Sequence, residues 1–270
     1  MRPLADCAAE VLSTADAAEK TRLSRAHAAD WFAARAAGEV PPVGRADPPL
    51  RPARPDRPEL LDPREVPKRK PGSAEGRTAM LHAVAHIELN AVDLHWDVIA
   101  RFAHIPMPAG FYDDWVQAAD EESKHFGLLS DCLAARGAHY GALPAHAGMW
   151  RAAEDTAEDI MGRLAVVPMV LEARGLDVTP DMIALFRRHD ETDAVAALET
   201  IYAEEVSHVA YGSKWFHFLC GRHEEDPKET FHALVRRYFK GGLKPPFNTE
   251  KRAEAGLPPD FYWPLAEEAR

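Results

Sequence analysis

Two glutamate–histidine motifs are the residues of this chain that could do chemistry together. Glu122 and His125 form one motif, in EESKH, and Glu205 and His208 form the other, in EEVSH. Three residues make nearly one turn of helix, so both side chains of a motif project from one face and could bind one metal ion. A single match of this type is expected by chance from 23 glutamates and 13 histidines. The motifs therefore gain meaning only from their surroundings.

The spacing of two further glutamates supplies that context. Glu88 precedes Glu122 by 34 residues, and Glu172 precedes Glu205 by 33. Each half of the pattern predicts a helical hairpin with a lone glutamate on one helix and Glu-x-x-His on the next. A third match, Glu229–His232, has no glutamate at a comparable distance before it, and we interpret it as the chance match.

The lone glutamates lie in apolar surroundings. Glu88 shares its helical face with Val92 and Ile99, and Glu172 follows the apolar run AVVPMVL. A buried carboxylate is costly unless a cation compensates for it, and two divalent ions would balance the four carboxylates. Oxygen donors with one imidazole per ion favour iron, or alternatively manganese, over zinc and copper. The predicted ligands of two metal ions are Glu88, Glu122, His125, Glu172, Glu205 and His208.

Other polar residues lie near these positions in the pattern. His95 comes seven residues after Glu88 and could support a ligand or be an extra one, although a hydrogen-bonded interior histidine is the favoured interpretation. Tyr202 lies three residues before Glu205 and could donate a hydrogen bond to a ligand or relay electrons, although plain core packing is favoured. His82 and His86 are interpreted as hydrogen-bonded interior histidines. The acidic neighbours of the ligands, Glu121 and Glu204, point about 100° away on a helix and are expected to face solvent.

The elements that must position these residues are helical throughout. Helical periodicity predicts four long helices at residues 75–103, 110–136, 147–174 and 191–221. Further helices are expected at 5–37, 180–189 and 226–240, with Gly137 and Gly175 ending the second and third long helices. Pro168 should kink or open the third helix. No segment shows β alternation, so the predicted class is all-α.

Composition divides the chain into four parts. Ten prolines lie between Val40 and Gly72, which excludes a helix there and predicts an extended arm. The predicted parts are an N-terminal helix packing on the bundle (1–39), the Pro-rich arm (40–73), a four-helix bundle (74–222), and a C-terminal helix and tail (223–270).

Bulk properties exclude several functional classes. The net charge is −11, which speaks against nucleic acid as a partner. The longest strongly apolar stretch, LAVVPMVL, is too short to span a bilayer, and the N-terminus lacks the apolar run of a secretion signal. Three widely spaced cysteines without a CxxC pair fit a reducing compartment. We expect a cytoplasmic protein with no membrane partner, and a homodimer is compatible with the pattern.

The two hairpins resemble the ferritin-like di-iron carboxylate superfamily. HAVAHIELNAVDLHWD, DEESKHF, PMVLEARGLDVTP, EEVSHVAYG and KPPFN are more closely similar to a ferritin-like family of bacteria and plants that is known only as a domain of unknown function. This resemblance implies a ferritin-like four-helix bundle holding two metal ions. It also implies that Glu122 and Glu205 bridge the ions, while Glu88 and Glu172 each bind one.

The expected function is oxidation or hydroxylation of a small substrate by O2 at a di-iron centre. The substrate and the electron donor are not identified by any motif. Three alternatives share the ligands: a ferroxidase or iron-storage shell, a manganese catalase-like peroxide disproportionation, and a non-enzymatic bundle that keeps the metals for stability or as a metal-dependent binding module. The long arm and the C-terminal extension would be awkward in a closed storage shell.

Overall fold

A computed structural model describes residues 2–62, 65–67, 69–146 and 148–268, and these residues are mostly helical. The all-α prediction is therefore confirmed. The chain divides into two compact units. Unit 1 contains Met1–Trp150 and His189–Ala197, and unit 2 contains Arg151–Arg188 and Leu198–Arg270. The described helices lack an apolar stretch of the length that a bilayer crossing requires.

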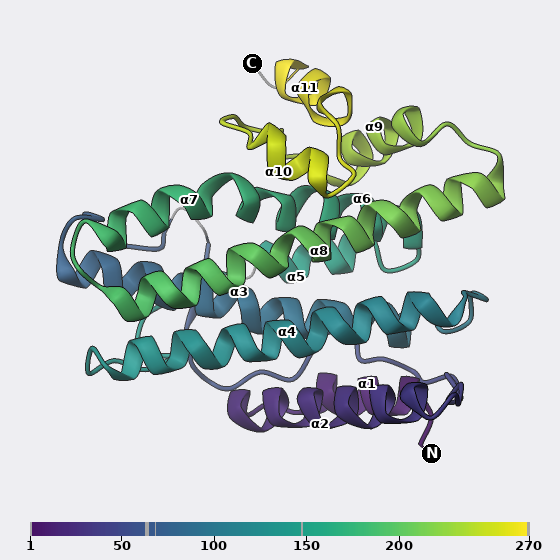
Figure 1. The fold of residues 1–270 in the computed structure, drawn as a ribbon, viewed down its shortest axis with the longest axis horizontal. Helices are drawn as coiled ribbons and strands as arrows, with labels where there is room; N and C mark the ends of the chain where they lie inside the picture. The colour runs from purple at the N-terminus through teal and green to yellow at the C-terminus, as the bar shows by residue number, and fades with distance from the viewer. Residues whose placement is uncertain (1, 63–64, 68, 147, 269–270) are drawn as a thin grey trace. The chain divides into compact units, whose positions relative to one another are not determined.

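Unit 1 is built on a hairpin of two long helices that lie side by side (Figure 1). Helix α3 spans Ala74–Arg101 and α4 spans Ala109–Ala134, both within two residues of the predicted bounds. Ser73 caps α3 by accepting a hydrogen bond from the Gly76 N–H group (3.0 Å). Gly137 follows α4 with φ +68°, as its predicted role at the helix end requires.

Two N-terminal helices cover this hairpin, with α1 (Leu4–Ser13) on α3 and α2 (Ala17–Ala36) on α4. The prediction of one helix over residues 5–37 is wrong. Asp16 breaks it, because its carboxylate accepts a hydrogen bond from the Glu19 N–H group and caps α2 (2.8 Å). This Asp-x-x-Glu pattern was a readable start signal in the sequence.

The described residues of the Pro-rich arm form no helix, and hydrogen bonds tie their backbone to the helices of unit 1. The Ala53 N–H donates to the Leu12 carbonyl (2.7 Å), and Arg101 donates to the Pro49 carbonyl (2.9 Å). A two-residue parallel pair joins β1 (Leu60–Leu61) to β2 (Ala145–His146). This pair corrects the expectation of no strand; two residues are too few to produce an alternating pattern.

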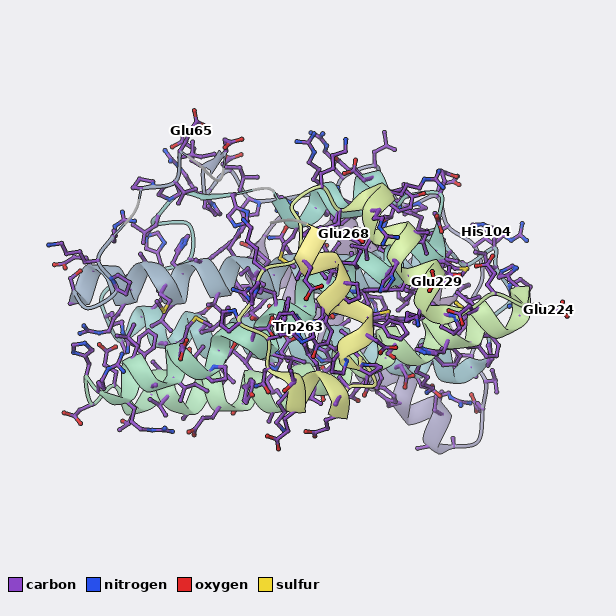
Figure 2. All side chains as sticks on the ribbon, turned by 90° about the horizontal axis from the view of Figure 1, so that it is seen from above. Glu65, His104, Glu224, Glu229, Trp263 and Glu268 are labelled. Atoms are coloured by element: carbon purple, nitrogen blue, oxygen red, sulfur yellow. The ribbon has the colours of Figure 1, made fainter. Side chains whose placement is uncertain are left out.

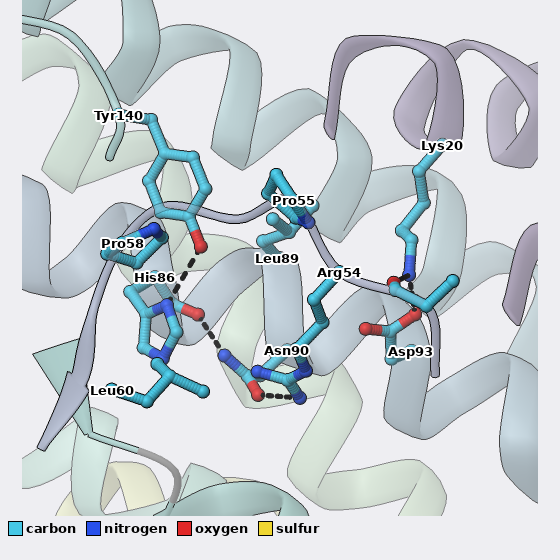
Figure 3. A pocket seen from close by; sticks show the side chains of 11 residues that line it. Lys20, Arg54, Pro55, Pro58, Leu60, His86, Leu89, Asn90, Asp93 and Tyr140 are labelled. Atoms are coloured by element: carbon cyan, nitrogen blue, oxygen red, sulfur yellow. Dashed lines mark hydrogen bonds and ion pairs between the residues drawn. The ribbon is translucent and has the colours of Figure 1, made fainter. Parts of the chain in front are cut away.

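A cavity of about 20 Å³ lies between the arm and α3, which is room for about one water molecule (Figure 3). Lys20 reaches it from α2, donates to the Ala53 carbonyl (3.0 Å) and forms an ion pair with Asp93. Both members of this pair are almost fully buried, at 1% and 2% exposure. Arg54 of the arm donates to the side-chain oxygen of Asn90. Polar contacts thus hold the arm against the face of α3 that carries Asn90 and Asp93.

Unit 2 contains an interrupted helix where the sequence predicts a continuous one at 147–174. Helix α5 (Gly148–Asp155) begins in unit 1 and ends in unit 2, and Asp159 caps α6 (Ile160–Val166). A π-helix, η1 (Val167–Glu172), follows and leads directly into α7 (Ala173–Arg187). Gly175 therefore does not end a helix, and the predicted separate helix at 180–189 is the second half of α7.

Helix α7 passes through Pro180 in spite of the hydrogen bond that proline removes. Leu176, Thr179, Ile183 and Phe186 are all buried and recur at helical spacing, so packing of this face compensates for the lost bond. Pro180 therefore does not begin a separate helix, because the buried side chains on either side of it stabilise a continuous one.

The π-helix sits where the sequence predicts a distortion at Pro168. Proline has no N–H group to complete the regular α-helical ladder, and the widened turn accommodates this loss. Helix α8 (Thr192–His223), which belongs to unit 2 from Leu198 onward, approaches the π-helix through Gly212. A Cβ atom at Gly212 would lie 2.4 Å from Cγ of Pro168.

The chain end forms three helices, α9 (Pro227–Tyr238), α10 (Thr249–Glu254) and α11 (Pro259–Glu268). The expected C-terminal tail thus contains two helices that proline content obscured. Arg252 of α10 makes two hydrogen bonds to Asp177 of α7 (2.8 and 2.7 Å), and its guanidinium lies against the rings of Phe247 and Tyr262. This buried contact attaches the extension to the rest of unit 2.

Gly212→Ala should destabilise unit 2 because the new methyl group would overlap the rigid Pro168 ring. We expect a loss of about 1–3 kcal/mol in the free energy of unfolding, as for other overpacked sites. Gly221→Ala is the matched control, since Gly221 also lies in α8 and a Cβ atom there meets nothing within 4 Å. Thermal unfolding of both variants checks the prediction, and equal melting temperatures would contradict it.

Candidate metal centre

Helices α3 and α4 place three predicted ligands of unit 1 together. Glu88, Glu122 and His125 are 3%, 0% and 0% exposed, and each offers a donor atom within 4.8 Å of the others. The Nδ1 atom of His125 is 3.2 Å from Oε2 of Glu88 and 3.5 Å from Oε2 of Glu122. The spacing of 34 residues between the two glutamates has therefore brought them to the same depth of the hairpin.

The electrostatics of this cluster are unfavourable without a cation. Burial raises the pKa of Glu88 well above its usual value, and the negative charge of Glu122 raises it further, against the opposing effect of His125. Two carboxylates at such depth must either bind protons or face positive charge. The buried Glu/His cluster could therefore hold a metal ion.

The donor distances also fit a shared ion. Imidazole and carboxylate donors bind a first-row divalent ion at about 2.1 Å, so two donors on one ion are separated by roughly 3.0 Å when adjacent and 4.2 Å when opposite. The two distances from His125 fall in this range. The geometry suits such an ion but does not distinguish iron from manganese.

His95, two turns after Glu88 on α3, approaches one member of this cluster, Glu122. Its Nε2 atom is 3.6 Å from Oε1 of Glu122, and its side chain is 1% exposed. The ring stacks on Trp115 of α4 with centroids 5.4 Å apart and an interplanar angle of 26°. His95 was predicted to lie near the site, but Trp115 was not. Its position could have been inferred, because Trp115 precedes Glu122 by seven residues and so shares its helical face.

Unit 2 holds the other three predicted ligands. Glu172 ends the π-helix, and Glu205 and His208 lie on α8; all three are buried. The Nδ1 atom of His208 is 3.8 Å from Oε1 of Glu205. Gly212 lies one turn after His208 on α8 and contacts Pro168 one turn before Glu172. The π-helix therefore packs against the face of α8 that carries Glu205 and His208.

Residues outside the ligand set have other contacts. The Tyr202 hydroxyl accepts a hydrogen bond from Asn248 (2.7 Å), in the KPPFN segment. His232 of the third motif hydrogen-bonds to the Asp260 and Phe261 carbonyls (both 3.0 Å), while its companion Glu229 is exposed (Figure 2). These contacts give His232 a structural role. Glu121 and Glu204 are partly exposed rather than fully solvent-facing.

The two other histidines of α3 are hydrogen-bonded interior residues, as predicted. His86 contacts the Tyr140 hydroxyl (2.8 Å) and the His146 carbonyl (3.0 Å). His82 accepts a hydrogen bond at Nε2 from the Gly141 N–H group (2.9 Å). Burial, with a smaller effect of nearby cations, lowers the pKa of His82 from 6.5 to about 4.

Acid should destabilise the metal-free protein partly through His82. In the unfolded chain His82 binds a proton below pH 6.5, whereas in the folded chain it stays neutral down to about pH 4. The folded state is therefore destabilised relative to the unfolded state as the pH falls from 6.5 to about 4. We expect His82 to contribute about 1–2 kcal/mol of this loss. Urea unfolding of chelator-treated protein between pH 7.5 and 4.5 should show a shallower decline for His82→Gln. An identical decline would contradict the prediction.

A family model described as "Protein of unknown function (DUF455)" matches residues 13–263. The chain belongs to this family. The DUF455 match includes all six predicted ligands and His95. A protein of Haemophilus influenzae with the name "Uncharacterized protein" is 40% identical over 212 residues, which cover 75% of this chain and 72% of that protein. No solved structure matches the chain.

Proposed function

We propose that this DUF455 protein is a ferritin-like oxidoreductase that holds two metal ions, iron or alternatively manganese, in a four-helix bundle. The observation that carries the proposal is the buried group of Glu88, Glu122 and His125, whose donor atoms are spaced as ligands of a shared ion. The burial of Glu172, Glu205 and His208 on a second hairpin of matching spacing supports the same role for them.

Ferrous ions held by Glu88, Glu122, His125, Glu172, Glu205 and His208 would supply two electrons for the reduction of O2, so we favour oxidation or hydroxylation of a small substrate. The chain's own contribution is to bind the ions and keep bulk water away. Leu81, Val92 and Leu129 lie one or two helical turns from the ligands on α3 and α4 and are fully buried, so apolar side chains flank the ligands. Such apolar surroundings would help to keep bulk water from bound ions. The substrate is an oxidisable small molecule, and a separate electron donor must restore the reduced ions.

Anaerobic loading with ferrous iron followed by addition of oxygenated buffer tests this function. We expect two irons per chain and rapid O2 uptake, measured with an oxygen electrode. Retention of two irons with no O2 uptake over many minutes would overturn the oxidase reading while leaving the metal site intact.

Three further experimental results would distinguish the alternative functions. Iron uptake far beyond two per chain, in an assembly of shell-like mass by size exclusion, would indicate storage. Peroxide disproportionation by the manganese-loaded protein, without O2 uptake by the iron-loaded one, would indicate a catalase. A melting temperature that rises on metal binding, without O2 uptake or peroxide disproportionation, would indicate a site that only stabilises the fold.

A further inference from the structure

The Glu122 carboxylate has different imidazoles on its two oxygens. His125 Nδ1 is 3.5 Å from Oε2, whereas His95 Nε2 is 3.6 Å from Oε1. Both separations fall in the range of roughly 3.0–4.2 Å expected for two donors on one ion. A carboxylate that bridges two ions presents one oxygen to each. The two histidines are therefore placed to serve different ions.

The position of His95 is fixed by packing. Its ring stacks on Trp115, and both side chains are almost completely buried, at 1% and 0% exposure. Stacking on a rigid indole restricts rotation of the imidazole and holds its Nε2 atom toward Glu122. Preorganised donors of this kind bind metal with little loss of side-chain entropy.

The second hairpin has no matching histidine. His95 follows Glu88 by seven residues, and the residue seven after Glu172 is Thr179. Thr179 is buried, but its neutral hydroxyl is a much weaker ligand than an imidazole. The two halves of the repeat therefore offer unequal donor sets.

We propose that His95 is a seventh ligand, bound to the ion on the Oε1 side of Glu122. This inference rests on the proposed two-metal function. In the proposed function each Glu-x-x-His motif supplies one imidazole to its own ion, so the ion that His95 also binds has two imidazoles and the other ion has one. The additional donor strengthens metal binding at that position, so the two positions differ in affinity.

Stepwise loading of the metal-free protein with Mn²⁺ tests the proposal without any turnover. With one equivalent added, we expect pulsed electron paramagnetic resonance to detect two directly bound imidazole nitrogens in the wild-type protein and one in His95→Gln. Equilibrium dialysis should show two unequal binding steps in the wild type. The tighter step should weaken by at least about tenfold in His95→Gln, and the other step should change less.

His86→Gln is the matched control, because His86 is a buried histidine of the same helix whose ring contacts Tyr140 and His146. It should keep two nitrogens and both affinities. A single nitrogen in the wild type, or unchanged Mn²⁺ binding by His95→Gln, would overturn the proposal for His95 alone. A wild-type protein that binds no Mn²⁺ or Fe²⁺ would overturn the two-metal function as well. The wild-type nitrogen count needs no variant, so poor folding of His95→Gln does not remove the test.

Discussion

Glu122→Gln should abolish stable binding of both metal ions. Glu122 is the fully buried carboxylate with one oxygen beside His125 and the other beside His95. Glutamine keeps one neutral oxygen, so the variant loses the negative charge and can no longer present an oxygen to each ion. Loss of a supporting partner alone weakens metal binding about 10–100-fold, and loss of a shared ligand should exceed that range. Metal analysis after gel filtration of the loaded variant, with dialysis against Fe²⁺ or Mn²⁺, measures the effect.

Glu121→Gln is the control for this experiment. Glu121 is the adjacent residue on α4, is partly exposed and accepts a hydrogen bond from Gln117 (2.8 Å). It should retain both ions with unchanged affinity. If Glu122→Gln also kept two ions per chain, our assignment of Glu122 as a shared ligand would be wrong.

Lys20→Met should destabilise the fold by about 3–5 kcal/mol, the usual consequence of breaking a buried ion pair. The substitution leaves the carboxylate of Asp93 buried without its cation and also removes the hydrogen bond to the arm at Ala53. Burial already raises the pKa of Asp93 in spite of Lys20. Chemical denaturation at neutral pH would measure the loss.

The double variant Lys20→Met/Asp93→Leu should recover much of that stability, since neither charge then remains buried. Arg22→Met gives the matched control on the same helix. Its ion pair with Glu19 is exposed, so its removal should change stability by less than about 1 kcal/mol. A Lys20→Met protein as stable as Arg22→Met would show that the buried pair contributes nothing.

The long helices of unit 1 were predictable because periodicity and end signals agree in them. The proximity of Glu88, Glu122 and His125 was predictable for the same reason. In a regular helix, the spacing of two residues in the sequence determines their relative position on one face. The bounds of α3 and α4 and the role of Gly137 followed from these local rules.

The remaining features depend on contacts distant in sequence. The π-helix follows from Pro168 together with the close approach of Gly212, and no local pattern distinguishes it from a kink. Helix α7 survives Pro180 because of the face that it buries. The spacing from Glu88 placed His95 near the site, but the orientation of its ring depends on stacking against Trp115 of another helix.

The clamped arm also determines how the protein should respond to proteases. An extended segment rich in arginine would normally be cut first by trypsin. Here Arg51, Arg54 and Arg57 are each followed by proline, a bond that trypsin cleaves poorly, and the backbone at Pro49 and Ala53 is hydrogen-bonded to unit 1. Opening the segment to a protease requires those contacts to break together. Residues 49–58 of the arm should therefore survive limited digestion as part of the folded core, and cleavage there should report the unfolding of unit 1.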